Sequence, residues 1–182
     1  MRIAHALRTA ITGGAVLVLA AGCGTEVGGQ ATSTSTTTTP SVDNLLNPCT
    51  DISDEWLIET GVDPATEQDI VNPTDASAWR ICGWRSVDLP YRLDLLSTSR
   101  TIDEARANPD LEILREITIG SRQGLVLQNK SDSDGDICYV SLPAAQGMFE
   151  IAVAWRSSQP KTHDRCELAI EHATDLEPHL PK

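Results

Sequence analysis

The sequence predicts an α+β fold in which short helices and a C-terminal helix pack on a mostly antiparallel sheet of about six strands. The expected order of elements is helix, two strands, helix, four strands, helix. Apolar residues alternate from Phe149 to Trp155, which is typical of a strand with one buried face. From Cys166 to Leu180 they recur at intervals of three and four, which is typical of a helix lying on a sheet. A barrel is the alternative architecture.

The first helix is expected after Ser53, which can cap it through its side chain, and Gly61 ends it. A second short helix follows Thr101, because Thr101 and Glu104 have the spacing of a capping box. The last helix is expected to begin near Thr162. Strand-like composition and length predict strands at 79–86, 91–98, 112–119, 124–128, 137–142 and 148–156.

Residues 1–22 have the order of a secretory signal, with Arg2 and Arg8 before an apolar run of about a dozen residues and no acidic residue. The run is shorter than the ~20 residues that a membrane-spanning helix needs. Small residues precede Cys23, in a pattern that resembles the bacterial lipobox, although Ala20 stands where Leu or Val is usual. We therefore expect export, cleavage before Cys23 and lipidation of its thiol, with several acyl chains holding the protein to the membrane.

Residues 23–44 are rich in Thr, Ser and Gly and have almost nothing to bury, which predicts a flexible stalk that could carry O-linked glycans. A single folded domain is expected at 45–182. The net charge of −12 becomes −14 once Arg2 and Arg8 are removed with the signal. This charge argues against binding nucleic acid or anionic lipid headgroups and leaves solubility or a cationic partner as its explanation.

Four cysteines remain after Cys23: Cys49, Cys82, Cys138 and Cys166. In an exported chain an even number of cysteines implies two disulfides, with three possible connectivities. We favour the sequential pairing, Cys49 with Cys82 and Cys138 with Cys166, in which each bond closes a loop of about 30 residues. A zinc site or a redox centre is the alternative, but the chain lacks a Cys-x-x-Cys motif and short Cys or His pairs.

The lipobox, the Thr-rich stalk, Pro48-Cys49 and the later Arg80-Ile81-Cys82-Gly83-Trp84 resemble small actinobacterial cell-envelope lipoproteins of the mycobacterial Lpr type. These proteins are built around a domain of unknown function, so the resemblance implies an exported, lipid-anchored domain and supplies no activity, catalytic residue or ligand. The order of strands and helices also looks like the PsbP/Mog1-type α+β sandwich. That analogy implies a fold and no function.

Asp132, Asp134 and Asp136 form the one cluster that could supply oxygen ligands to calcium. The segment departs from the EF-hand pattern, because Lys130 and Ser141 stand where the first and twelfth loop positions require acidic residues. An Asp-Gly turn between two strands is the simpler explanation.

A hydrolase would need a nucleophile beside a histidine, but no Gly-x-Ser-x-Gly motif is present. His163, His172 and His179 are expected at the surface, and nothing in the sequence marks an activated serine. The serines considered are Ser97, Ser99 and Ser121.

Trp79 and Trp84 lie five apart on one expected strand and so on opposite faces. Trp84 is expected in the core beside the first disulfide, and the other tryptophan could contact a partner or a sugar. Trp56 and Trp155 are the two remaining tryptophans.

We expect a lipoprotein on the outer face of the cytoplasmic membrane that serves as a non-enzymatic binding or accessory module for another envelope component, with no cofactor or metal. A carrier of a lipid or other apolar ligand is the alternative, and it would need a cavity of several hundred cubic ångströms. An envelope hydrolase is the third possibility. A flat exposed apolar patch would favour the accessory module.

Overall fold

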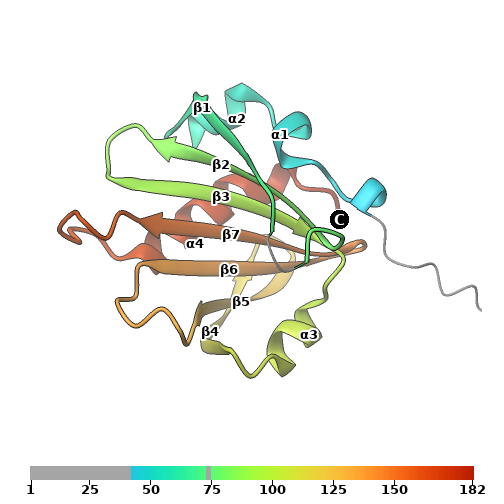
Figure 1. The fold of residues 1–182 in the computed structure, drawn as a ribbon. Helices are drawn as coiled ribbons and strands as arrows, with labels where there is room; N and C mark the ends of the chain where they lie inside the picture. The colour runs from blue at the N-terminus through green and yellow to red at the C-terminus, as the bar shows by residue number, and fades with distance from the viewer. Residues whose placement is uncertain (1–41, 73–74) are drawn as a thin grey trace, which may run out of the picture. The chain divides into compact units, whose positions relative to one another are not determined.

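A computed structural model describes residues 42–72 and 75–182 and contains one open seven-stranded sheet (Figure 1). The strand order is β1-β2-β3-β7-β6-β5-β4, and every neighbouring pair is antiparallel. The strands are β1 (Val62–Ile70), β2 (Trp79–Ser86), β3 (Tyr91–Thr98), β4 (Leu111–Ile119), β5 (Arg122–Asn129), β6 (Ile137–Ala144) and β7 (Gly147–Trp155). The predicted α+β class is confirmed, and the sheet does not close into a barrel.

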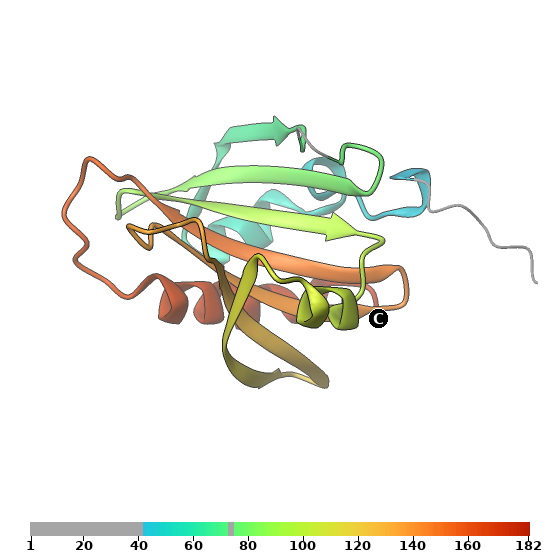
Figure 2. The ribbon, with the colours of Figure 1, turned by 60° about the horizontal axis from the view of Figure 1, so that its bottom comes forward.

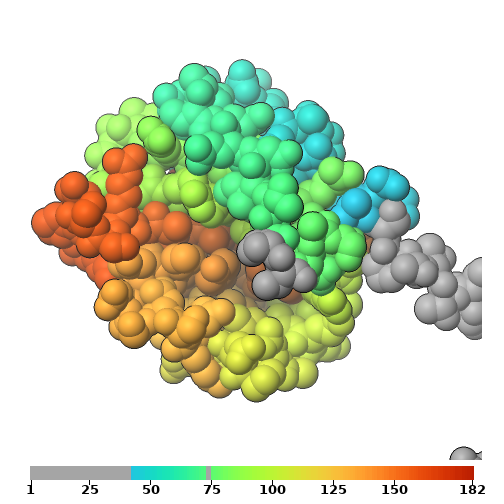
Figure 3. Space-filling model, viewed as in Figure 1, coloured from blue at the N-terminus to red at the C-terminus, as the bar shows by residue number. Residues whose placement is uncertain are grey.

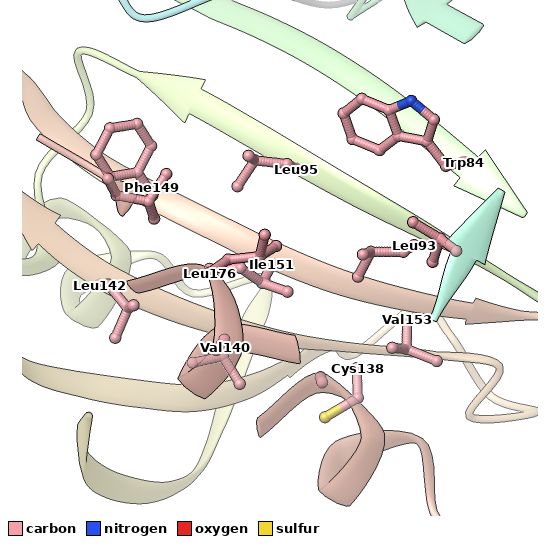
Figure 4. Packing of buried hydrophobic residues seen from close by; sticks show 14 of the residues in the cluster. Trp84, Leu93, Leu95, Cys138, Val140, Leu142, Phe149, Ile151, Val153 and Leu176 are labelled. Carbon is pink, nitrogen blue, oxygen red and sulfur yellow. The ribbon is translucent and has the colours of Figure 1, made fainter. Parts of the chain in front are cut away.

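The helix α4 (Arg165–Leu176) covers one face of the sheet, against β6 and β7. It lies behind the strands in Figure 1 and below β2, β3 and β7 in Figure 2. The main hydrophobic core fills the space between helix and sheet (Figure 4). The largest fully buried side chains on this face include Trp84, Leu93, Leu95, Leu142, Phe149, Ile151 and Leu176.

The two predicted short helices form where their caps are. The side chain of Ser53 accepts a hydrogen bond from the Trp56 N–H at the start of α2 (Asp54–Glu59). Thr101 and Glu104 make both bonds of a capping box at the start of α3 (Ile102–Ala107). A further one-turn helix, α1 (Pro48–Asp51), was not predicted, since four residues carry too little periodicity to be detected.

The C-terminal helix begins three residues later than predicted. Asp164 is its N-cap and accepts hydrogen bonds from the backbone N–H groups of Cys166 and Glu167. The helix ends at Leu176, followed by a short 3-10 turn, η2 (Glu177–His179), because Pro178 has no N–H to continue the α-helical ladder. Leu180 nevertheless reaches the same core, as its spacing predicted.

The predicted sheet of about six strands did not include β1. This strand contains Pro64 and several acidic residues, all of which are poor strand formers, and it lies at the edge of the sheet. Its register shifts between Asp63 and Gln68, where the Thr66 hydroxyl replaces a backbone acceptor for the Arg85 N–H. An edge strand of this kind depends on its neighbour, so its own residues carry a weak signal.

Both predicted disulfides are confirmed. Cys49 bonds to Cys82 and joins α1 to β2, and Cys138 bonds to Cys166 and joins α4 to β6. The four sulfurs are therefore unavailable as thiolate ligands for zinc or for thiol redox chemistry. The carboxylate of Glu67 lies beside the first bond, but the two neighbouring sulfurs are already bonded to each other.

Candidate functional site

The sheet face opposite α4 carries a hollow of about 560 Å³. A second, smaller apolar cluster forms there where Ala105 of α3 packs against Leu125, Leu127 and Met148. Figure 3 shows this face, which is recessed between the yellow-green surface around α3 and the orange surface around β6. The lining residues are Asn72, Asp75, Trp79, Leu96, Arg100, Glu104, Ala105, Asn108, Leu111, Leu127, Asn129, Tyr139, Met148 and Glu150. The volume lies within the range of known small-ligand sites.

Because side chains alternate along a strand, the residues on the floor of the hollow are those that point away from the main core. On β7, Phe149 and Ile151 enter the main core, so Met148 and Glu150 face the other way. Glu150 lies between Leu96 of β3 and Ser141 of β6 in the strand register. The three central strands therefore hold one acidic side chain in the middle of the floor.

Glu150 is 6% exposed, and the only hydrogen bond of its carboxyl group within the described residues comes from the Ser141 hydroxyl at 2.8 Å. Burial raises the pKa of Glu150 to about 7, while the bond from Ser141 acts in the opposite direction. Near neutral pH this carboxyl group is thus poised between its charged and uncharged forms. Its second oxygen remains available to a bound molecule.

Tyr139 lies on the same face and lines the hollow. Burial, together with the negative charges of Glu150 and Asp94, raises the pKa of Tyr139 to about 12, so its hydroxyl keeps its proton. The neighbouring Asp94 differs from Glu150, because Arg92 binds both of its oxygens at 2.5 and 2.8 Å. Gly83, opposite Asp94 in the register, makes room for that carboxylate, since a Cβ there would collide with it.

The rim of the hollow is charged. Arg100 donates to Asp75 at 2.7 Å and to Glu104 at 3.4 Å. The pKa of Asp75 is lowered, first by its bond from Arg100 and then by that from Ser77. The pKa of Glu104 is also lowered, chiefly by the Thr101 backbone N–H that it accepts in the capping box. Arg100 is the one cation of the described lining, and both acidic rim residues bind it.

The prediction that all three C-terminal histidines are surface residues was wrong for His172, which belongs to α4, faces the sheet and is 3% exposed. Its two ring nitrogens contact the hydroxyls of Thr60 at 2.7 Å and Tyr91 at 2.8 Å. Thr60 donates its proton to Asp175, so it accepts one from Nδ1 of His172. Burial lowers the pKa of His172 to about 4, and the ring stays neutral. His172 lies three residues after Ala169, on the apolar side of the helix, and this spacing could have indicated that His172 is buried.

The other two histidines lie elsewhere. His163 is exposed, with its ring 6.3 Å from that of Trp155 and a hydrogen bond to Thr162. His179 stacks on Trp56, with ring centroids 4.1 Å apart. The three histidines therefore do not converge on one site, and none of them lines the hollow.

The serines considered as nucleophiles are not brought to a histidine either. Ser97 is buried and accepts a hydrogen bond from Gln146 at 2.6 Å. Ser99 is half-buried, and Ser121 is exposed with Lys182 at 3.5 Å. Among the described residues, no hydrogen bond joins a serine to any of the three histidines.

The acidic cluster between β5 and β6 forms a turn. The Asp132 carboxylate accepts hydrogen bonds from the backbone N–H groups of Asp136 and Ile137 at 3.0 and 2.7 Å. Asp136 pairs with Lys161 at 2.7 Å, which lowers the pKa of Asp136. Gly135 has a φ of +59°, the left-handed conformation that such a turn requires. Asp134 is exposed. The protein's own donors thus occupy two of the three carboxylates proposed for a cation.

Trp79 and Trp84 lie on opposite faces of β2, as predicted. Trp84 is fully buried in the main core, and Trp79, on the opposite face of the same strand, is half-buried and lines the hollow. Glu150 and Tyr139 were not predicted as site residues. The alternation of β7 indicated that Glu150 faces away from the core, but only the packing of α3 and β4 shows that this second face is partly covered.

The predicted signal at 1–22, the lipidation site Cys23 and most of the stalk lie outside the described residues. Within the described residues, no helix has the length and apolar character needed to cross a membrane.

A family model described as "Protein of unknown function (DUF3558)" matches residues 18–179 of this chain. No curated protein and no solved structure matches it.

Proposed function

Since the chain belongs to DUF3558, a family of unknown function, we propose its role from the hollow itself. The protein acts as a non-enzymatic binding module of the cell envelope that holds a small ligand, or a small part of another envelope component, on the open face of the sheet. The observation that carries this proposal is the hollow of about 560 Å³ with a buried carboxyl group on its floor. The hollow combines an apolar cluster with many polar groups, and small-ligand sites are concave surfaces of this size.

The N-terminal sequence supports the location that this proposal includes. A signal-like segment at 1–22, followed by Cys23 in a lipobox-like context, favours an exported lipoprotein anchored on the outer face of the cytoplasmic membrane. The resemblance to actinobacterial Lpr-type lipoproteins supports a proposal of the same setting. The two disulfides agree with an oxidising compartment.

A carrier of an apolar ligand is the second candidate, and the size of the hollow favours it. The polar rim and the carboxyl group on the floor suit a ligand with both a polar and an apolar part rather than a purely apolar chain. An envelope hydrolase has less support, because the described lining contains no Ser, Cys or His.

Native mass spectrometry tests the proposal on full-length protein purified from its own envelope in mild detergent. We expect an acylated Cys23 and a co-purifying species on the domain. Leu96→Trp should remove that species by filling the hollow, because Leu96 lies on the floor and is half-buried. Val87→Trp, at an exposed site on the loop after β2, is the matched control and should retain it. A species that survives in Leu96→Trp would place binding elsewhere.

A further inference from the structure

The carboxyl group of Glu150 has no cation beside it, although it is buried. Its single hydrogen bond comes from a neutral hydroxyl, that of Ser141. In contrast, Asp94 on the same face has a bidentate partner in Arg92, and Glu177 in the opposite layer has Arg122 at 3.0 Å. Glu150 therefore stands apart from the other buried acidic residues of the described chain, each of which is paired with a cation.

The cations nearest to the hollow are already engaged. Arg100 binds Asp75 and Glu104 at the rim, and Arg92 binds Asp94. With Glu150 included, the described lining carries three carboxyl groups and one guanidinium group. A negatively charged ligand would meet this excess of acid, whereas a cation would relieve it.

Apolar and aromatic side chains share the hollow with Glu150 and with the polar residues of the rim. Trp79, Met148, Leu96 and Tyr139 line the same space. A carboxylate in such surroundings is unfavourable without a partner, and it becomes favourable when a charged donor enters with it. Aromatic side chains also attract ammonium groups through their ring faces.

We propose that the hollow binds a protonated amine that carries an apolar group, with the ammonium group donating to Glu150 and the apolar group packing against Trp79 and Met148. This inference rests on the proposed binding function and names the chemical class of its ligand. A divalent metal ion fits less well, since Glu150 is the one carboxylate on the floor that is free of a cation and such ions require several oxygen ligands.

Isothermal titration calorimetry with two matched probes tests the proposal. The probes are hexylammonium chloride and 1-hexanol, which share an alkyl chain and differ in charge. The full-length protein is placed in zwitterionic lipid nanodiscs, and heats from empty nanodiscs are subtracted. At pH 8 we expect hexylammonium to bind about tenfold more tightly than hexanol. Leu96→Trp should weaken the binding of both probes.

Two variants that each remove one negative charge test whether Glu150 causes the preference for hexylammonium. Glu150→Gln keeps the size of the side chain and an oxygen for the Ser141 bond, and it should abolish the preference for hexylammonium. Glu171→Gln removes one charge from an exposed site on α4, across the sheet, and should leave the preference unchanged. A preference that persists in Glu150→Gln would overturn the assignment to this carboxyl group.

The pH dependence provides a test that needs no variant. Hexylammonium remains charged below its pKa, which is close to the ~10.4 of lysine, so its binding should weaken by about tenfold from pH 8 to pH 6 as Glu150 takes up a proton. Tyr139 from β6 and the rim groups Asp75, Arg100 and Glu104 also line this space, and the charges of Asp94 and Arg92 from β3 act on Tyr139. Comparison with Glu150→Gln separates their contribution, because that variant should lose the dependence.

The outcomes distinguish the two proposals. If hexylammonium and hexanol bind equally well and Leu96→Trp weakens both, the hollow is a binding site but the preference for an amine is wrong. If neither probe binds, the amine proposal fails. The binding function itself then fails only if the natural co-purifying species is also absent or survives in Leu96→Trp.

Discussion

The two faces of the sheet bury polar groups in different ways. On the face covered by α4, each ring nitrogen of His172 contacts a hydroxyl group. Arg122 donates hydrogen bonds to Glu177 and to three backbone carbonyl groups. The indole N–H of Trp84 is an exception on that face, since it has no acceptor among the described residues. On the open face, Glu150 keeps a free oxygen beside a hollow. Apart from Trp84, these polar groups of the covered face are satisfied within the protein, whereas the open face leaves one oxygen of a buried carboxyl group without a partner among the described residues, and the proposed binding site rests on this difference.

The largest expected effect is on the covered face. Phe149→Ala should lower the free energy of unfolding by about 3 to 5 kcal/mol, because it leaves a cavity in a fully buried core. Leu96→Ala, on the adjacent strand but on the open face, should cost only about 1 kcal/mol because this side chain is half-buried. Urea unfolding of both variants provides the measurement. Equal losses would show that the open face contributes as much packing as the covered one.

The second disulfide, between Cys138 and Cys166, should contribute slightly less to the free energy of unfolding than the side chain of Phe149. Replacing both Cys138 and Cys166 by Ala should lower the free energy of unfolding by about 3 to 4 kcal/mol, since the bond closes a loop across 28 residues in the unfolded chain. It also fixes α4 to β6 and so holds the covering layer in place. Urea unfolding of the double variant measures the loss. A loss of under about 1 kcal/mol would indicate that packing alone retains the helix.

His172 should make the covered face sensitive to acid. Its pKa of about 4 in the folded chain is below the usual 6.5, so the unfolded chain binds the proton more strongly. The resulting stability is present above pH 6.5 and is lost as the pH falls to about 4, on the order of 2 to 3 kcal/mol. Unfolding of wild type and His172→Gln across this range measures the difference, which should shrink at low pH. A constant difference would contradict the lowered pKa.

On the open face, protonation of Glu150 should raise the stability of the fold, whereas protonation of His172 lowers it. Its pKa of about 7 exceeds the usual 4.5, so the folded chain binds the proton more strongly. Its contribution is present below pH 4.5 and is lost as the pH rises to about 7, on the order of 2 kcal/mol after allowance for the open hollow. Glu150→Gln should therefore gain stability over wild type between pH 5 and 8 in urea unfolding. The same gain in the Glu171→Gln control would assign the effect to net charge instead.

Local signals in the sequence were sufficient for most of the elements. The caps at Ser53 and Thr101 and the alternation from Phe149 to Trp155 involve neighbours within a few residues, and each was confirmed. The sequential disulfides were also predicted, because close spacing of cysteines makes those loops the least costly to close. The strand β1 was missed, since its place at the sheet edge depends on pairing with β2 rather than on its own composition.

The sequence by itself thus determined the α+β class and the direction in which each side chain of β7 points, and it favoured one of three pairings of the cysteines, which the structure then confirmed. Only the tertiary structure decided how much each face is covered. It placed Glu150 on the floor of a hollow and His172 in a buried network, although both are polar residues in amphipathic segments. Burial depends on elements that are distant in the chain, and the hollow that contains Glu150 is lined partly by α3 and β4, which begin some 40 to 50 residues earlier.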